Sequence, residues 1–302
     1  MRAVVLNTFG GPEQLSVRDV PEPVTPAADA VLIRTAAAAV NPVDLQTRAG
    51  LHAGHSTVRP PMVLGWDVAG TVTAVGSDVT DLRVGDQVVA MSAQMATGRG
   101  TYAETVALPA GIVAPAPASL TPAHAAALPL AGLTARQALD ALALPEGASV
   151  LITGAVGSVG GLAVQLARLR GLSVVAQVRS RQDEDEARAL GADRVVDPED
   201  LPEAEVDGLL ETAGDPRAIR AVRAGGRAVT IVPSRVPAGE RGIQVAVSHV
   251  EQDGPGLRAL ASLVDAGQVR LRIAQEFPFE TAAEAHRALA AGGVRGKLLL
   301  LP

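Results

Sequence analysis

Short runs in which apolar and polar residues alternate fill the first third of the chain, and turn residues separate these runs. Such alternation is typical of β-strands that bury one face. Gly76-Ser77-Asp78 and Gly85-Asp86 supply turn chemistry between apolar runs. The pattern predicts a compact β-barrel whose strands cover residues 3–6, 15–20, 30–38, 67–75, 87–91 and 104–108.

The pattern becomes helical from Thr121 onward. Thr121 precedes Pro122, a pair typical of a helix N-terminus, and predicts an Ala-rich helix over residues 121–133, followed by a second over residues 134–142. Strands then alternate with helices such as residues 184–190, whose length suits right-handed crossovers. We therefore predict a doubly wound α/β fold with six parallel strands at residues 149–153, 173–178, 194–196, 208–211, 227–232 and 243–247.

The C-terminal tail returns to strand, helix and strand, at residues 271–276, 282–291 and 297–300. Ala114-Pro115-Ala116-Pro117 is the clearest linker signal. Together they predict two domains, the first of them discontinuous. The barrel domain is expected from residues 1–120 and 268–302, and the doubly wound domain from residues 121–267.

Composition narrows the class of protein. The 302 residues hold 48% hydrophobic residues and no Cys, which excludes disulfides, thiolate catalysis and cysteine-bound zinc. The formal charge of −6 is dispersed and aromatic residues are few, so nucleic acid is not an expected partner. No apolar run approaches the length that spans a bilayer, and Met1 leads directly into a strand, so a cytoplasmic protein without a membrane partner is expected.

The richest motif is a glycine turn. The apolar run of residues 149–154 leads into Ala155-Val156-Gly157-Ser158-Val159-Gly160, and a helical pattern over residues 162–169 follows. A turn almost without side chains lets backbone N–H groups approach a diphosphate at a helix N-terminus. Tight packing alone is the alternative reason for such glycines. We predict that a dinucleotide binds at Gly154, Val156, Gly157, Ser158 and Val159.

The residues after the second strand of this unit indicate which dinucleotide binds. An NAD-binding Rossmann unit carries an acid at this strand end, but the chain reads Arg179-Ser180-Arg181, and the first acid is Asp183. Guanidinium and hydroxyl groups suit a 2′-phosphate. Simple solvation of both arginines is the alternative. The prediction is NADP(H), bound at Arg179, Ser180 and Arg181.

Two further strand ends lie at the carboxyl edge of the predicted sheet, where ligands of such sheets bind. Thr212 and Ala213 follow the fourth strand, and Val232 and Pro233 follow the fifth. We expect these four residues to line the ribose and nicotinamide. Ordinary strand-end turns would account for them equally well.

The chain as a whole resembles the zinc-free quinone oxidoreductase branch of the medium-chain dehydrogenase/reductase superfamily. The resemblance runs nearly from end to end. It is carried by Asn41-Pro42-Val43-Asp44, Arg48-Ala49-Gly50, Gly65-Trp66-Asp67-Val68-Ala69-Gly70, Val84-Gly85-Asp86-Gln87-Val88, Gly100-Thr101-Tyr102-Ala103-Glu104, Gly132-Leu133-Thr134-Ala135, the glycine turn with Gln165, Leu190-Gly191-Ala192-Asp193, Ala285-His286 and Gly296-Lys297.

This resemblance implies a GroES-like β-barrel joined to a Rossmann domain, an active cleft between them, and NADPH as hydride donor. It also implies that no metal is bound. Asn41-Pro42-Val43-Asp44 stands where zinc-using relatives carry a catalytic Cys segment, and Gly65-Trp66-Asp67 stands in place of their Gly-His-Glu triplet. Lys297 resembles a position close to the cofactor, although a solvated terminal lysine is equally compatible with the sequence.

Candidate catalytic residues follow from the charge that develops on the substrate oxygen. Asn41 is the first, as a group that holds the nicotinamide or the carbonyl, and Thr134, expected at a helix start, is the second. Asp44 is a third candidate, or a residue that caps the helix after Asn41. The tyrosine common after Arg-x-Gly in the family is missing, so His52 or His55 could donate a proton instead, or have no task.

The leading hypothesis is a zinc-independent, NADPH-dependent reductase of a quinone or similar electrophilic carbonyl compound. The alternatives are reduction of the double bond of an enone or enoyl thioester, and a non-catalytic NADPH-binding sensor. The apolar strand at residues 243–247 could form an exposed sheet edge, and a homodimer paired there is expected.

Overall fold

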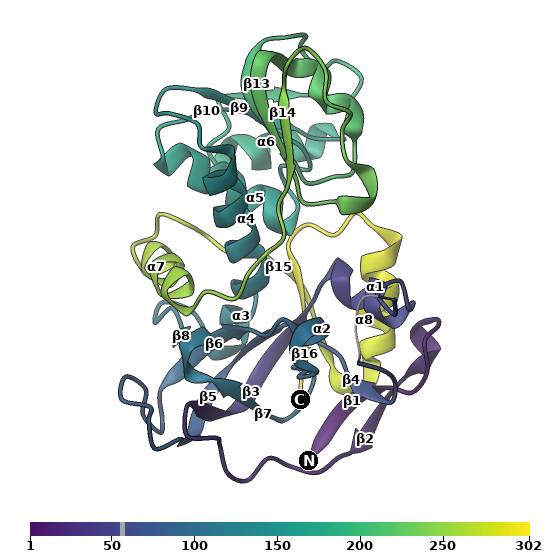
Figure 1. Ribbon diagram of the computed structural model, residues 1–302, viewed down its shortest axis with the longest axis vertical. Coiled ribbons are helices and arrows are strands. Elements are labelled where there is room, and N and C mark those ends of the chain that lie inside the picture. The colour runs from purple at the N-terminus through teal and green to yellow at the C-terminus, as the bar shows by residue number, and fades with distance from the viewer. Residues whose placement is uncertain (55–57) are drawn as a thin grey trace. The chain divides into compact units, whose positions relative to one another are not determined.

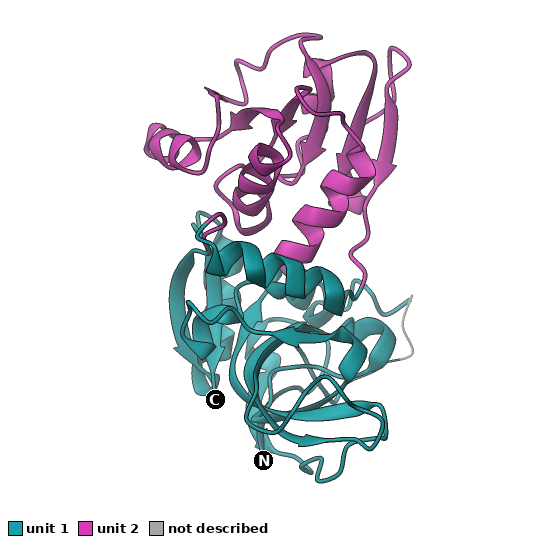
Figure 2. Ribbon diagram, turned by 90° about the vertical axis from the view of Figure 1, so that its left-hand side faces the viewer, with its two compact units in different colours: residues 1–130, 252–267, 271–302 teal, residues 131–251, 268–270 magenta. Residues whose placement is uncertain are grey.

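The computed structural model describes residues 1–54 and 58–302, which form two compact units (Figure 2). Unit 1 comprises Met1–Leu130, Gln252–Gly267 and Leu271–Pro302, and unit 2 comprises Ala131–Glu251 and Gln268–Arg270. The expected domains, 1–120 with 268–302 and 121–267, stay a prediction, because compactness alone does not show which segments fold together. Within the described residues, no helix is both long and apolar enough to cross a membrane.

Unit 1 is built on two sheets (Figure 1). The smaller is antiparallel, in the order β2-β1-β4, and the larger has the order β15-β16-β3-β5-β6-β8, with β7 also paired to β3. Their strands are β1 (Arg2–Leu6), β2 (Leu15–Asp19), β3 (Ala30–Val40), β4 (Met62–Val63), β5 (Asp67–Val75), β6 (Gln87–Met91), β7 (Thr105–Pro109), β8 (Val113–Pro115), β15 (Ile273–Pro278) and β16 (Lys297–Leu301).

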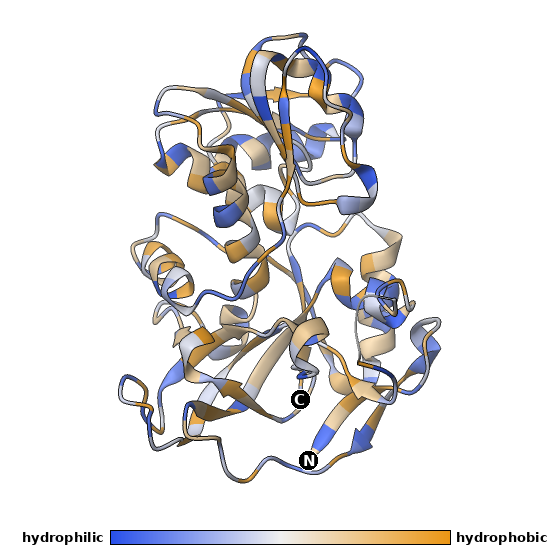
Figure 3. Cartoon of the chain, in the orientation of Figure 1, coloured by the Kyte–Doolittle hydropathy of each residue, from blue (hydrophilic) through white to orange (hydrophobic). Residues whose placement is uncertain are grey.

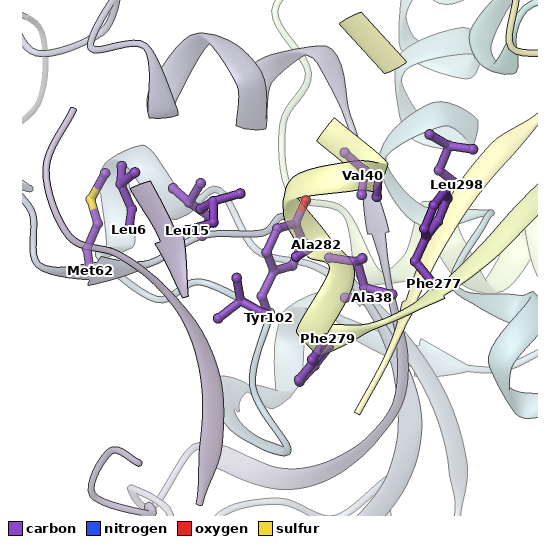
Figure 4. Close-up of a cluster of buried hydrophobic side chains, with 14 residues drawn as sticks. Leu6, Leu15, Ala38, Val40, Met62, Tyr102, Phe277, Phe279, Ala282 and Leu298 are labelled. Carbon is purple, nitrogen blue, oxygen red and sulfur yellow. The ribbon is translucent and has the colours of Figure 1, made fainter. Parts of the chain in front are cut away.

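The C-terminal tail belongs to the same compact unit as the N-terminal strands. Strand β16 pairs antiparallel with β3, so that Leu298 lies opposite Val40 and Leu300 opposite Ala38. All four of these residues lie in one hydrophobic core with Tyr102 and Phe279 (Figure 4). Because so much apolar surface is shared, the tail is part of the core and not an appendage.

The helix α7 (Gly254–Asp265) of unit 1 is amphipathic and packs on a strand of the larger sheet. In α7 the buried positions include Leu257, Leu260, Ala261 and Val264, a spacing that puts them on one face. That face packs against β8. Hydrophobic and hydrophilic residues both occur along this helix (Figure 3). The other helices are α1 (Pro42–Arg48), α2 (Gln94–Thr97), α3 (Pro122–Ala125) and α8 (Ala282–Ala291).

Unit 2 is a six-stranded sheet in the order β11-β10-β9-β12-β13-β14, and every neighbouring pair is parallel. This confirms the doubly wound α/β prediction. The order runs outward in both directions from β9, so ligands are expected at the carboxyl ends of β9 and its neighbours. The strands are β9 (Ser149–Ile152), β10 (Ser173–Gln177), β11 (Arg194–Val196), β12 (Val206–Glu211), β13 (Val222–Thr230) and β14 (Gln244–Val247), connected partly by α5 (Ser158–Leu169) and α6 (Arg181–Ala189).

The helices around residue 129 differ from the prediction. Instead of helices over residues 121–133 and 134–142, the chain forms the short α3 and then α4 (Pro129–Leu142). Proline lacks an N–H and has a fixed φ, so Pro129 suits the first turn of a new helix and not the middle of an old one. Thr134 therefore lies inside α4, more than one turn after its start, and the expectation of a helix start at Thr134 was wrong.

Gly160 allows α5 to approach the end of β9 closely, and its replacement tests this packing. A Cβ built at Gly160 would overlap the carbonyl oxygen of Gly154. We expect Gly160→Ala to lower the free energy of unfolding by ~1–3 kcal/mol, measured by urea denaturation. Gly111→Ala is the control, because a Cβ there meets no atom within 4 Å. Equal stability of the two variants would contradict the close approach.

Candidate functional site

The glycine turn of unit 2 joins β9 to α5 as the sequence predicted. Gly154 has a φ of +58°, a left-handed conformation that favours glycine. Gly157 precedes the first residue of the helix, Ser158, and offers no side chain to the space in front of the helix. A Cβ at Gly157 would lie 3.1 Å from the Gly154 carbonyl oxygen. Both glycines therefore suit a tight turn in which the backbone itself forms the surface before α5, and a helix N-terminus of this kind fits the diphosphate of a dinucleotide.

Arg179, Ser180 and Arg181 follow β10, the strand next to β9. Both arginines are exposed, and neither forms an ion pair with any other residue that the structure describes. The hydroxyl of Ser180 donates to the Asp183 carboxylate at 2.7 Å, so it faces its own helix α6. Two guanidinium groups thus stand near the glycine turn, and they fit a 2′-phosphate better than the serine does.

The strand ends after β12 and β13 carry the other predicted cofactor residues of unit 2. Ala213 and Pro233 are exposed there, and Thr212 and Val232 are half-buried. Thr134 is buried within α4. The structure therefore brings Thr212, Ala213, Val232 and Pro233 to the carboxyl edge of the same sheet as the glycine turn, whereas Thr134 lies on a separate helix.

Unit 1 contains a buried polar cluster of Asn41, Asp67 and Lys297. The Lys297 ammonium lies 3.0 Å from Asp67 Oδ2 and also donates to Asn41 Oδ1. Asn41 Nδ2 donates to the same Asp67 oxygen at 2.9 Å and to the Ala39 carbonyl at 3.2 Å. The remaining oxygen, Asp67 Oδ1, accepts from the backbone N–H of Leu130 at 2.6 Å. None of the three side chains is more than 4% exposed.

This cluster changes what is expected of two predicted site residues. Lys297 is not a solvated terminal lysine, because its ammonium is buried against a carboxylate. Both amide hydrogens of Asn41 are engaged inside unit 1, and its oxygen accepts from Lys297. Binding of a nicotinamide or carbonyl by Asn41 stays a prediction. Nothing in the sequence links Asp67 to Lys297, which are far apart along the chain.

Asp44 caps α1, which starts after Asn41. Its carboxylate accepts from the Asn41 backbone N–H at 2.8 Å, the reciprocal contact of a capping box. The side chain is completely buried, and burial raises the pKa of Asp44 to about 7. The geometry supplies the capping function expected as the alternative to catalysis. A catalytic role of Asp44 stays a prediction.

The histidines of unit 1 have different surroundings. His286 is fully buried, 3.3 Å from an Arg48 nitrogen, and burial together with that positive charge lowers the pKa of His286 to about 3. It is therefore neutral and structural. His52 lies 3.1 Å from the Gln46 side-chain oxygen. His55, the other candidate proton donor, lies outside the described residues.

One buried acid of unit 2 escaped the sequence prediction. Glu211 is the last residue of β12, is completely buried and accepts hydrogen bonds from both neighbouring strand ends. A signal existed, because Thr153, Glu211 and Thr230 are polar residues that each end an apolar strand run. Across residues 1–54 and 58–302, no group of three or more His, Asp or Glu side chains is arranged to hold a metal ion.

Comparison with known proteins agrees with both units. Residues 27–118 match the alcohol dehydrogenase GroES-like domain, and residues 190–300 match the zinc-binding dehydrogenase family. An NADPH-dependent alkenal/one oxidoreductase of Arabidopsis thaliana chloroplasts is 34% identical over all of this chain and 80% of its own length. The quinone oxidoreductase of Mus musculus is 31% identical, over all of this chain and 98% of its own length.

Solved structures show the same relationship. The quinone oxidoreductase from Coxiella burnetii superimposes with a TM-score of 0.91 at 29% identity, covering all of this chain and 99% of its own. The unit 1 sheets thus correspond to a GroES-like domain and the unit 2 sheet to a Rossmann fold. The chain is an oxidoreductase that belongs to the quinone oxidoreductase branch of the medium-chain dehydrogenase/reductase superfamily.

Proposed function

We propose that this oxidoreductase uses NADPH to reduce a quinone or a similar electrophilic carbonyl compound, and that it does so without zinc. The bound nicotinamide supplies the hydride. The observation that carries the proposal is the Lys297 ammonium, which touches both Asn41 and Asp67. These two residues stand in the segments that hold zinc in metal-using relatives.

The charge on Lys297 explains how such a site can do without a metal. Asp67 is buried, and a buried carboxylate needs a cation or several donors close by. Lys297, Asn41 and the Leu130 amide meet that need. The chain offers no cysteine to bind zinc, and the cation that balances Asp67 is a residue of the chain itself. Zinc would have to displace Lys297 to bind Asp67.

The NADPH preference is supported by two features of unit 2. The glycine turn at Gly154 and Gly157 offers a cradle for the diphosphate, and the helix α5 directs its partially positive end there. Arg179 and Arg181 stand exposed at the end of the adjacent strand, where they would hold the 2′-phosphate. The Arabidopsis relative is itself described as NADPH-dependent.

That relative also favours a second candidate, reduction of the carbon–carbon double bond of an alkenal or enone. This reaction uses the same hydride donor but needs a proton for the neighbouring carbon. The one tyrosine of the chain, Tyr102, is fully buried in the hydrophobic core, so its hydroxyl is not exposed to donate this proton. Quinone reduction is therefore the first choice and alkene reduction the second.

A homodimer is part of the proposal. Among residues 1–54 and 58–302, strand β14 pairs with β13 alone, so Gln244–Val247 forms an edge of the described sheet. Exposed edges of this kind pair readily with a second copy. The cytoplasmic location and the cleft between the two domains stay predictions.

The substrate class can be tested by turnover. The purified protein is mixed with NADPH and, in separate reactions, with benzoquinone, phenanthrenequinone and crotonyl-CoA, while NADPH absorbance is followed. We expect oxidation of NADPH with the quinones and little with the thioester. Turnover with the thioester alone would refute the quinone assignment. Tight NADPH binding without turnover on any substrate would favour the sensor.

The cofactor assignment predicts a selective effect at Arg179. A charge-assisted hydrogen bond to phosphate contributes ~1.5–3 kcal/mol, so Arg179→Ala should weaken NADPH binding by about 10- to 100-fold. Because NADH lacks the 2′-phosphate, its binding should barely change. Calorimetric titration of both cofactors measures the difference. Arg188→Ala, an exposed arginine later in α6, is the control and should leave both affinities unchanged. An equal loss of affinity for NADH and NADPH in Arg179→Ala would show that Arg179 does not contact the 2′-phosphate.

The buried ion pair predicts that removal of Lys297 lowers the stability of the protein strongly, and that a second substitution at Asp67 restores part of it. Lys297→Met leaves Asp67 buried without its cation, so the free energy of unfolding should fall by ~3–5 kcal/mol. Adding Asp67→Asn removes the charge that lacks a partner and should restore part of that loss. A double-mutant cycle by urea denaturation, with Asp67→Asn alone as the fourth protein, measures the coupling. A free energy of unfolding for Lys297→Met within ~1 kcal/mol of the wild-type value would contradict a tight buried pair.

A further inference from the structure

Glu211 accepts hydrogen bonds from two backbone amides of the loop after β12 and from two threonine hydroxyls. One carboxylate oxygen, Oε1, accepts from the backbone N–H of Ala213 at 2.8 Å and of Asp215 at 3.0 Å. The same oxygen accepts from the Thr153 hydroxyl at 3.1 Å. The other, Oε2, accepts from the Thr230 hydroxyl at 2.9 Å. This buried carboxylate therefore has four donors, and they come from the ends of three adjacent strands.

Thr153 connects Glu211 to a further backbone amide, that of Thr212. Its hydroxyl oxygen accepts from the Thr212 N–H at 2.8 Å and from the Ala213 N–H at 3.3 Å, while its hydrogen goes to Glu211. In return, the Thr212 hydroxyl donates to the Thr153 carbonyl at 2.6 Å. The loop after β12 is thus hydrogen-bonded to the end of β9 through both the backbone N–H and the side-chain hydroxyl of Thr212.

This arrangement determines which backbone groups of the loop can bind a ligand. The N–H groups of Thr212, Ala213 and Asp215 all point at Glu211 or Thr153, so none of these three can donate to a ligand. A buried negative charge also lies directly beneath the loop. Both features oppose a phosphate at this place and suit an uncharged ligand group that donates hydrogen bonds, such as a hydroxyl or a carboxamide.

The order of the strands indicates which part of NADPH would lie at the loop after β12. In the proposed function, the adenosine side lies over the end of β10 at Arg179, and the diphosphate lies at the end of β9. Strand β12 is the neighbour of β9 on the opposite side from β10. The half of the cofactor that continues in this direction is the nicotinamide riboside, which carries hydroxyls and a carboxamide but no further phosphate.

We propose that Glu211 is a positioning residue that, directly and through Thr153, turns the amides of Thr212, Ala213 and Asp215 inward. It so presets this loop to receive the uncharged nicotinamide riboside half of NADPH. The inference rests on the proposed function. Glu211 acts through Thr153 and the loop backbone, and it does not itself touch the cofactor.

Two substitutions and two probes test this role. Glu211→Leu removes all four acceptor contacts, whereas Glu211→Gln keeps an oxygen for the loop amides and can donate to the Thr230 hydroxyl. Binding of NADPH and of adenosine 2′,5′-bisphosphate, which lacks the nicotinamide half, is measured by calorimetry for each protein. We expect Glu211→Leu to weaken NADPH binding by about tenfold or more, while the bisphosphate affinity stays within about twofold. Glu211→Gln should keep both affinities within about threefold of the wild type.

Thr153→Val covers the case in which Glu211→Leu does not fold. It removes the hydroxyl between the loop and Glu211 but leaves the carboxylate in place, and it should weaken NADPH selectively as well. Unchanged NADPH binding in folded Glu211→Leu or Thr153→Val, or equal loss for both probes in these variants, would overturn the inference. Failure of the wild type to bind either probe is a different result, because it would overturn the proposed function itself.

Discussion

The buried pair of Asp67 and Lys297 organises the polar groups at the start of β5 and β16 in unit 1. Two charges taken from water into a protein interior are costly, and their attraction compensates only when further hydrogen bonds complete the site. Here Asn41 and the Leu130 amide complete it. The pair joins the start of β5 to the start of β16, so the C-terminal tail is held to the barrel by charge as well as by the apolar core.

A buried carboxylate organises unit 2 in a comparable way. Glu211 joins the ends of β9, β12 and β13, as Asp67 joins β5 and β16 to the start of α4. The two acids differ in their partners, because Asp67 contacts an ammonium, whereas the donors to Glu211 in the described part of the chain are hydroxyl and amide groups. In both units, apolar packing builds the sheet, and one buried acid fixes the polar groups at its edge.

The sequence predicted the repetitive parts of this architecture well. Alternation and turn residues located most strands, and the glycine turn at Gly154 gave the start of the Rossmann sheet. The break at Pro129 was missed because an Ala-rich stretch reads as continuous helix. The contact between Lys297 and Asp67 could not be predicted, because it depends on the register of β16 on β3, which local patterns do not encode. The roles of Asn41 and Thr134 depend on tertiary contacts in the same way.

The central claim is that a lysine and not a zinc ion balances the buried acid in a hydride-transferring enzyme. The most direct measurement combines elemental analysis of the purified protein with the rate of NADPH oxidation by a quinone, before and after treatment with a strong chelator. The account predicts substoichiometric zinc and the same rate in both samples. Stoichiometric zinc, with a rate that is lost on chelation and restored by added zinc, would contradict it.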